Sequence, residues 1–327
     1  MRLPQFNYLE PESIKEASSL LTEKGAAVIA GGTDLLVNMK KRVITPKYLV
    51  NLKHIEELKG LAFDETKGLR IGALTTLDVL SKSTLIKEKY PALAQATGRT
   101  AAPQLRNMAT IGGNVCLESM CMYYNQSAEW MKSRIPCFKR GGNQCYVAKG
   151  SKECVALFEA DTPPALLSLG ARVKIVGNSQ ERVLPLADIY TQKGQKANNL
   201  APTEFVQEIL IPAPPKNSGS AYQKMSQRES IDFPILGVAS QLTIAGGKCR
   251  EVKIAMTAVV SGPIRVKEAE EALSDQAVTD ELIAKAATIA QEKVRPLSHQ
   301  GISAWYKRKL IGVLVKGSLK QAWDLAK

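Results

Sequence analysis

The segment from Ala109 to Cys154 constrains this chain most strongly, because it joins a paired-glycine turn to a cluster of cysteines. The turn is Thr110-Ile111-Gly112-Gly113-Asn114, and five of the six cysteines follow it between positions 116 and 154. A glycine pair lets the backbone come close to a phosphate group. Clustered thiolates are typical ligands of a metal centre. The sequence therefore predicts two kinds of cofactor site next to each other.

The composition is that of an ordinary globular protein with room for two or three domains. The 327 residues are 45% hydrophobic and 23% charged. Aromatic residues make up 6%, which disfavours the stacking surfaces that bind single-stranded nucleic acid. The net charge of +13 indicates either a polyanionic partner or a solvated basic surface, and the scattered lysines favour the second. No nucleic-acid-binding motif is present, so we expect no nucleic-acid partner.

The N-terminal sequence MRLPQFNYLEPESIKEA contains no basic segment followed by an apolar core, so we expect no signal peptide. No window approaches the ~18 uninterrupted apolar residues of a membrane span. We therefore expect a cytoplasmic protein without membrane contact. In a reducing compartment, clustered cysteines indicate metal binding more often than disulfides.

The first part of the chain predicts a small α/β unit of alternating strands and helices. Residues 6–9, 26–30 and 48–52 read as strands, with helices between them. Gly31-Gly32-Thr33-Asp34 lies where the second strand meets a helix, which suits close approach of a diphosphate. It matches neither GxGxxG nor a P-loop, and alone such a pair is more often only a turn. Together with Gly112-Gly113, it could hold one pyrophosphate from two sides.

The remaining sequence predicts a larger α+β region and a separate C-terminal unit. Strands are expected near 69–77, 171–176, 182–185 and 203–212, and a linker at 213–219. The last part should contain an antiparallel sheet and three helices, of which the last spans 302–325. We therefore divide the chain into residues 1–57, 58–216 (with an inserted loop at 116–156) and 217–327.

Five motifs, in order along the chain, resemble the FAD-binding subunit of the xanthine dehydrogenase (molybdenum hydroxylase) family. They are AGGTDLL (30–36), RIGALTTL (70–77), QLRNMATIGGNV (104–115), DTPPAL (161–166) and SAYQKMSQRESIDFPILGVAS (220–240). The resemblance implies an α+β, FAD-binding fold of the p-cresol methylhydroxylase type. In this fold a small α/β subdomain and a larger α+β subdomain precede a C-terminal antiparallel α+β domain.

The resemblance also implies which residues contact FAD, and it implies no catalytic residue on this chain. The two diphosphate loops would be 29–36 and 110–114, with Thr75 and Thr76 adding contacts. Asp161 would bind the sugar or ribityl part, and Val206 and Lys224 would lie near the flavin ring. The full set is Ile29, Ala30, Gly31, Gly32, Thr33, Asp34, Leu35, Leu36, Thr75, Thr76, Thr110, Ile111, Gly112, Gly113, Asn114, Asp161, Val206 and Lys224.

The cysteine-rich loop departs from the general family pattern and resembles the β-subunit of 4-hydroxybenzoyl-CoA reductase. That resemblance implies a [4Fe–4S] cluster on Cys121, Cys137, Cys145 and Cys154. The residues alone favour iron–sulfur and zinc about equally, because no C-x-x-C pair is present. Cys116 is expected to be a small buried residue, although it could replace Cys121 as a ligand.

The resemblance implies an electron-transfer subunit that carries FAD and [4Fe–4S]. Its expected partners are a molybdopterin-binding large subunit and a small [2Fe–2S] subunit, in a dimer of heterotrimers, with ferredoxin as electron donor. The complex would remove the phenolic hydroxyl of 4-hydroxybenzoyl-CoA reductively. The alternative is the FAD subunit of a xanthine dehydrogenase-type hydroxylase that passes electrons to an acceptor, with a structural zinc loop. A non-enzymatic binding module is a third reading, which the two glycine turns disfavour.

Overall fold

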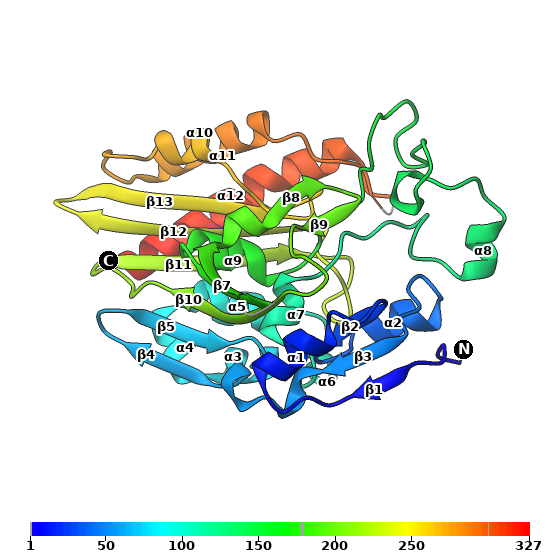
Figure 1. Ribbon diagram of the computed structural model, residues 1–327. Coiled ribbons are helices and arrows are strands. Elements are labelled where there is room, and N and C mark those ends of the chain that lie inside the picture. Colours follow the sequence, from blue (N-terminus) through cyan, green and yellow to red (C-terminus); the bar gives the residue numbers. More distant parts are fainter. Residues whose placement is uncertain (1, 178–179, 300) are drawn as a thin grey trace.

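The N-terminal residues form a small parallel sheet in the computed structural model, which describes residues 2–177, 180–299 and 301–327 (Figure 1). Its strands lie in the order β1 (Asn7–Leu9), β3 (Tyr48–Asn51) and β2 (Ala26–Ile29). Helix α1 (Ile14–Leu20) begins at Ser13, whose hydroxyl accepts a hydrogen bond from the Glu16 amide. Helix α2 (Leu35–Lys40) follows the first glycine turn.

The middle of the chain builds a five-stranded antiparallel sheet. Its order is β4 (Leu61–Asp64), β5 (Gly68–Gly72), β10 (Phe205–Ile211), β6 (Arg172–Gly177) and β7 (Gln180–Pro185). Strand β10 therefore arrives from far along the sequence and lies at the centre. A bulge between Val206 and Glu208 shifts its register with β6 next to the candidate site.

Short helices and one hairpin pack around this sheet. The helices are α3 (Leu77–Lys82), α4 (Thr84–Lys89), α5 (Pro91–Gly98), α6 (Pro103–Arg106), α7 (Ile111–Val115) and α9 (Thr162–Ser168). The hairpin pairs β8 (Tyr190–Lys193) with β9 (Lys196–Asn198). Their apolar residues share one core with the sheet, in which Tyr90 and Phe158 are the largest fully buried side chains.

The cysteine-rich insertion leaves the body of the protein as a loop that contains little regular structure. It holds α8 (Ala128–Lys132) and a 3-10 turn at Phe138–Arg140, and it projects beside α2 at the right of Figure 1. Its base is closed by a reciprocal pair of backbone hydrogen bonds between Met120 and Leu157, of 2.7 and 3.0 Å. The insertion thus begins and ends at adjacent points.

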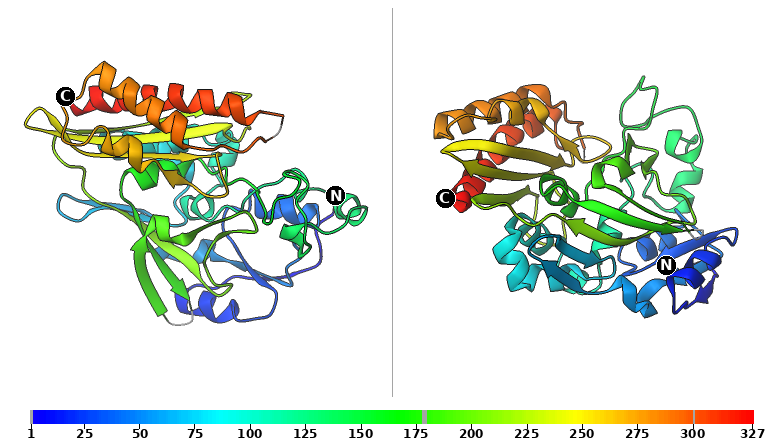
Figure 2. Two further views of the ribbon diagram at one scale, coloured as in Figure 1. Left: turned by 90° about the horizontal axis from the view of Figure 1, so that it is seen from above. Right: turned by 60° about the vertical axis from the view of Figure 1, so that its left-hand side comes forward.

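The C-terminal residues form a four-stranded antiparallel sheet covered on one face by long helices (Figure 2). The strands are β11 (Ser218–Met225), β12 (Leu236–Ala245), β13 (Lys248–Thr257) and β14 (Ile264–Arg265). Helices α10 (Lys267–Glu271) and α12 (Ala304–Ala326) pack on it, and α11 (Asp280–Lys293) packs against both of these helices. Helices α5 and α9 of the middle region also contact this sheet, through a small apolar cluster of Ala92, Ala96, Ala165, Tyr222 and Ala239.

The predicted α+β architecture is confirmed, with a small α/β unit, a larger α+β unit and a C-terminal antiparallel unit. The final helix was expected at 302–325 and spans Ala304–Ala326. The second glycine pair differs from expectation: it is not a turn, because Gly112 and Gly113 lie inside α7. Thr110 begins this helix by accepting the Gly113 amide, so the threonine imposes helical geometry on the glycines. The divisions at 57 and 216 remain predictions.

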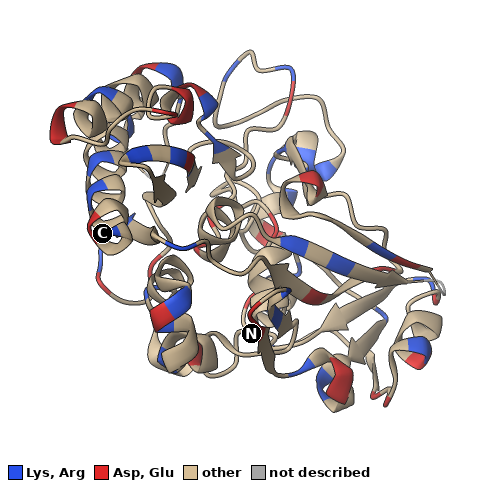
Figure 3. Cartoon of the chain, turned by 90° about the vertical axis from the view of Figure 1, so that its left-hand side faces the viewer, with Lys and Arg blue, Asp and Glu red and all other residues tan. Residues whose placement is uncertain are grey.

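Basic and acidic residues are spread over the helices and strands of every part of the molecule (Figure 3). This distribution agrees with the scattered lysines of the sequence. In the described part of the chain, each helix is too short or too polar to cross a bilayer.

Candidate functional site

The main cleft has a volume of about 720 Å³ and is lined by segments from several parts of the chain. The two glycine segments, the start of β10 and the base of the insertion all contribute to its wall. This volume lies in the range of cofactor and drug-sized ligand sites. The cleft is therefore large enough for a dinucleotide whose ends remain partly open to solvent.

The first glycine turn presents a run of free backbone donors to the cleft. In the described structure, the amides of residues 31–35 donate no hydrogen bond to protein. Gly32 adopts a φ of +71°, a left-handed conformation that favours glycine. Unpartnered amides at a polar surface are suited to phosphate oxygens. Burial raises the pKa of Asp34 above its ordinary value, although Asn38 donates to its carboxylate at 3.0 Å.

The glycines of the two segments have different structural roles. A Cβ on Gly31 would overlap the carbonyl oxygen of Met108, so Gly31 lets the two segments pack against each other. A Cβ on Gly112 would lie 2.8 Å from that of Ala73. Gly113 is exposed, and its Cβ would meet only the Thr110 hydroxyl. The glycines thus serve packing as well as access to the cleft.

The cleft brings together most of the residues predicted to contact FAD. The predicted residues that line it are Ala30, Gly31, Gly32, Thr33, Asp34, Leu35, Thr110, Gly112, Gly113, Asn114 and Val206. Those that do not line it are Ile29, Leu36, Thr75, Thr76, Ile111, Asp161 and Lys224. Several of the latter have structural partners instead: the Thr75 hydroxyl donates to Gly60, and Thr76 caps α3. Their contacts with a cofactor remain predictions.

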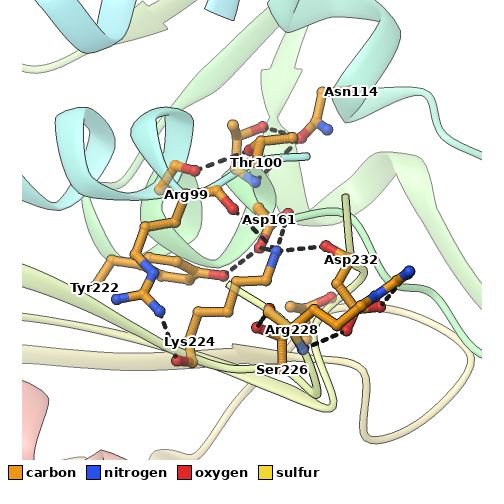
Figure 4. A network of polar contacts seen from close by, with 12 residues as sticks. Arg99, Thr100, Asn114, Asp161, Tyr222, Lys224, Ser226, Arg228 and Asp232 are labelled. Atoms are coloured by element: carbon orange, nitrogen blue, oxygen red, sulfur yellow. Dashed lines mark hydrogen bonds and ion pairs between the residues drawn. The ribbon is translucent and has the colours of Figure 1, made fainter. Parts of the chain in front are cut away.

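Asp161 and Lys224 form a buried ion pair that does not line the cleft; Figure 4 shows the polar contacts around it. The Lys224 ammonium lies 3.1 Å from Asp161 Oδ1 and also donates to the carbonyls of Arg99 and Asp232. The Tyr222 hydroxyl donates to Asp161 at 2.7 Å. Burial raises the pKa of Asp161 even though Lys224 acts to lower it. This network connects the start of α9 to β11. Both charged groups in it have several hydrogen-bond or ion-pair partners within the protein.

Asn114 joins this network to the cleft. Its side-chain oxygen accepts hydrogen bonds from the amide and hydroxyl of Thr162, at 3.1 and 2.6 Å. Asn114 therefore satisfies a free donor at the start of α9 while lining the cleft. Asn114 therefore holds the start of α9 in place, in addition to its predicted contact with the cofactor.

The four predicted cysteine ligands line one small cavity inside the insertion. Cys121, Cys137, Cys145 and Cys154 surround it together with aromatic residues of the loop. Cys116 lies apart and lines the large cleft instead. Burial raises the pKa of Cys116 to about 12 and also raises the pKa values of Cys121 and Cys154. All six cysteines are free thiols.

The four predicted cysteine ligands share one cavity but do not form a ready-made metal site. Within the described residues, no group of three or more His, Cys, Asp or Glu side chains is arranged to hold one ion. The Tyr123 amide donates a hydrogen bond to Cys121 Sγ at 3.4 Å. A metal centre on these thiols remains a prediction.

Aromatic residues pack the insertion around this cavity. The rings of Tyr123 and Tyr146 stack with centroids 5.5 Å apart. The Arg134 guanidinium lies 4.4 Å from the centroid of the Trp130 ring. These contacts give the loop an apolar core of its own.

Several polar residues of the cleft were not predicted. Asn38, Glu118, Lys139 and Asn198 line it, yet none belongs to a glycine motif. The sequence shows Lys139 only as one of several basic residues in the loop. Lys139 reaches the cleft because the insertion folds back, which the local sequence does not indicate.

Comparisons with known proteins cover the whole chain. Residues 4–214 match the family described as FAD binding domain in molybdopterin dehydrogenase, and residues 220–322 match the CO dehydrogenase flavoprotein C-terminal domain. The carbon monoxide dehydrogenase medium chain of Afipia carboxidovorans is 31% identical over 98% of both chains. The 6-hydroxypseudooxynicotine dehydrogenase complex subunit alpha of Paenarthrobacter nicotinovorans is 29% identical over 100% of this chain and 97% of its own.

Solved structures agree. The carbon monoxide dehydrogenase from Hydrogenophaga pseudoflava matches with a TM-score of 0.82 and 28% identity, over 99% of each chain. Fold and cleft together define the flavoprotein component of an oxidoreductase. The chain belongs to the FAD-binding medium subunits of the molybdenum hydroxylase family, which includes the CO and xanthine dehydrogenases.

Proposed function

We propose that this chain carries electrons as the FAD subunit of a molybdenum-dependent dehydrogenase complex of the xanthine dehydrogenase type. The observation that carries the proposal is the cleft lined by both glycine segments, with free amides at residues 31–35. Bound FAD would supply reversible storage of one or two electrons. The names of the relatives, which are dehydrogenases of CO, nicotinate and xanthine, support electron flow from substrate toward an acceptor.

The residues of the cleft would divide the binding of FAD between them. The free amides of 31–35 would hold the diphosphate, and Gly113 would leave room for it. Leu74, Leu200 and Val206 offer apolar surface to the flavin ring. Asp161 and Lys224, predicted to contact FAD, would instead fix the wall behind it unless their ion pair opens. The test is flavin content and affinity of the purified protein, and absence of flavin binding would overturn the proposal.

We propose the same partners as the resemblance implies. They are a large molybdopterin-binding subunit and a small [2Fe–2S] subunit, with two heterotrimers in the complex and the cytoplasm as compartment. The names "medium chain" and "complex subunit" of the relatives support membership of a multi-subunit enzyme. Co-purification of the tagged chain from its own host, followed by molybdenum and iron analysis, tests this assembly.

A second candidate function is favoured by the cysteine cavity. A chain close to the 4-hydroxybenzoyl-CoA reductase branch would hold [4Fe–4S] on Cys121, Cys137, Cys145 and Cys154 and pass electrons inward from ferredoxin. Four thiols around one cavity and an amide donor to Cys121 support such a cluster. The comparisons name dehydrogenases and do not favour this direction of flow. A structural zinc ion on the same thiols is the alternative.

Metal analysis of anaerobically purified protein distinguishes the two candidates. About four iron and four sulfide per flavin, lost in Cys137→Ser, would support the cluster. Cys249→Ala is the matched control, because Cys249 is buried in the C-terminal core away from this cavity. Zinc, or no metal, would contradict the cluster and favour the ordinary dehydrogenase. Retention of the metal in Cys121→Ser would identify Cys116 as the substitute ligand.

A further inference from the structure

The FAD cleft and the cysteine cavity share one wall. Of the described residues, only Tyr124 and Lys139 line both spaces. Lys139 lies in the 3-10 turn Phe138–Arg140, which starts directly after Cys137. Its ammonium lies 5.3 Å from the centroid of the Tyr124 ring. One aromatic ring and one cation thus belong to the walls of both proposed cofactor sites.

Lys139 is held in this wall by hydrogen bonds and an ion pair, and its side chain is almost fully buried. Its side chain is 4% exposed. The ammonium donates to the Ser119 hydroxyl at 2.7 Å and to the carbonyls of Gly194 and Gln195 at 2.9 and 3.2 Å. It also pairs with Glu118 at 3.1 Å, whose other oxygen accepts the Ala197 amide. These contacts fasten the insertion to the β8–β9 hairpin across the cleft.

A second connection runs from a predicted metal ligand to the glycine turn. The Cys121 amide donates to the Asn125 side chain at 2.9 Å, and Asn125 donates to Asn38 at 3.1 Å. Asn38 in turn donates to the Asp34 carboxylate. The Asn125 carbonyl accepts from Lys41 of α2's C-terminal end at 3.0 Å. The geometry of the cysteine loop is thereby coupled to that of the phosphate-binding turn.

We propose that Lys139 is a positioning residue shared by both sites: it orders the common wall and gives both cavities one fixed positive charge. This inference rests on the proposed binding of FAD in the cleft. Reduction adds negative charge to a flavin, and to an iron–sulfur cluster if the thiolates hold one. A buried cation beside both raises their reduction potentials. The charge of Lys139 therefore raises the reduction potentials of both sites together.

Removal of this charge should affect both cavities together. In Lys139→Met, Glu118 loses its cation and leaves a net negative group at the wall, so the potential of bound FAD should become more negative. The loosened loop should also expose the thiols. Lys139→Arg keeps the charge in a different hydrogen-bonding geometry, so the flavin potential should stay close to that of the wild type.

The experiment uses the full-length protein with FAD bound. One measurement is the midpoint potential of the flavin by spectroelectrochemical titration. The other is the alkylation rate of Cys121, Cys137, Cys145 and Cys154 by mass spectrometry after removal of any metal with a chelator. Lys132→Met is the matched control, because Lys132 is an exposed lysine of the same insertion.

The expected result is a more negative flavin potential and several-fold faster alkylation in Lys139→Met, with neither change in Lys132→Met. Equal behaviour of the two variants would overturn the proposal, and so would a change in only one cavity. Failure of the proposed function has a different signature: wild-type protein would then lack flavin before any substitution is made.

Discussion

At the scale of single residues, the sequence could predict which charged residues matter, but it could not predict that two of them form a buried ion pair. Asp161 and Lys224 were singled out by resemblance, but their mutual contact spans two parts of the chain and depends on tertiary packing. The side chains are 4% and 3% exposed, respectively. No local sequence pattern predicts such a buried ion pair, because each residue considered alone is typical of an exposed charged side chain.

Replacement of Asp161 by asparagine should destabilise the protein by about 3–5 kcal/mol, because Lys224 remains buried without a counter-charge. Urea unfolding of the two proteins measures the difference. The partly exposed pair Lys174–Glu181 provides the control, and Glu181→Gln should cost less than about 1 kcal/mol. A similar small loss for both variants would show that the buried pair is not essential to stability.

Lys307 of α12 gives a pH-dependent prediction. It is 1% exposed, its ammonium donates to the Ala258 carbonyl at 2.9 Å, and burial lowers its pKa from 10.5 to about 8 against the opposing effect of Glu159. Between pH 8 and 10.5 the unfolded chain therefore binds more protons, so this group's contribution to stability rises with pH.

The stability of wild type relative to Lys307→Met should accordingly increase by about 2 kcal/mol between pH 7.5 and pH 10. Chemical denaturation at both pH values measures it, and the variant cancels the titration of all other groups. A constant difference across this range would mean that the folded and unfolded states bind the Lys307 proton equally, so that burial does not lower its pKa.

At the scale of elements, periodicity and glycine patterns predicted strands and helices well where the period was regular. The first glycine turn and the helix after it lie where expected. The second pair was misread because two glycines normally disfavour a helix. Thr110 offsets this by capping α7, and packing of Gly112 against Ala73 fixes the position of the helix.

Alanine substitutions in the two segments should separate packing from cofactor access. Gly31→Ala places a Cβ against the Met108 backbone, so we expect a loss of folded protein. Gly113→Ala meets only a hydroxyl and should fold, while weakening FAD binding roughly tenfold, or ~1.4 kcal/mol. Thermal unfolding and flavin titration of both variants test this. Normal FAD affinity in Gly113→Ala would mean that the diphosphate does not approach this residue.

At the scale of the whole molecule, the order of the units followed from the sequence, whereas their mutual packing did not. The C-terminal sheet contacts α5 and α9 of the middle unit, and the Tyr222 amide donates to the Gln95 side chain at 2.7 Å. Small side chains at this interface, such as Ala92 and Ala165, permit the close approach. Alanines within helices give no sequence signal of such a contact.

A fragment that ends at residue 216 should therefore be unstable, although both its sheets are complete. It would expose the apolar cluster of α5 and α9 and leave Asp161 without Lys224 and Tyr222. We expect aggregation and loss of flavin, measured by size-exclusion chromatography and absorbance. A monomeric fragment that binds FAD would instead establish residues 1–216 as an independent folding unit.

The paired backbone hydrogen bonds between Met120 and Leu157 have a consequence for how the cysteine-rich insertion could be gained or lost in such a chain. Because the two ends of the insertion lie opposite each other on an antiparallel bridge, a two-residue turn could join them without strain elsewhere. Residues 121–156 are in this sense an exchangeable module. A flavin carrier could gain or lose this loop in one step, and the contacts affected would be those of the wall with Lys139 and those of Asn125 with α2.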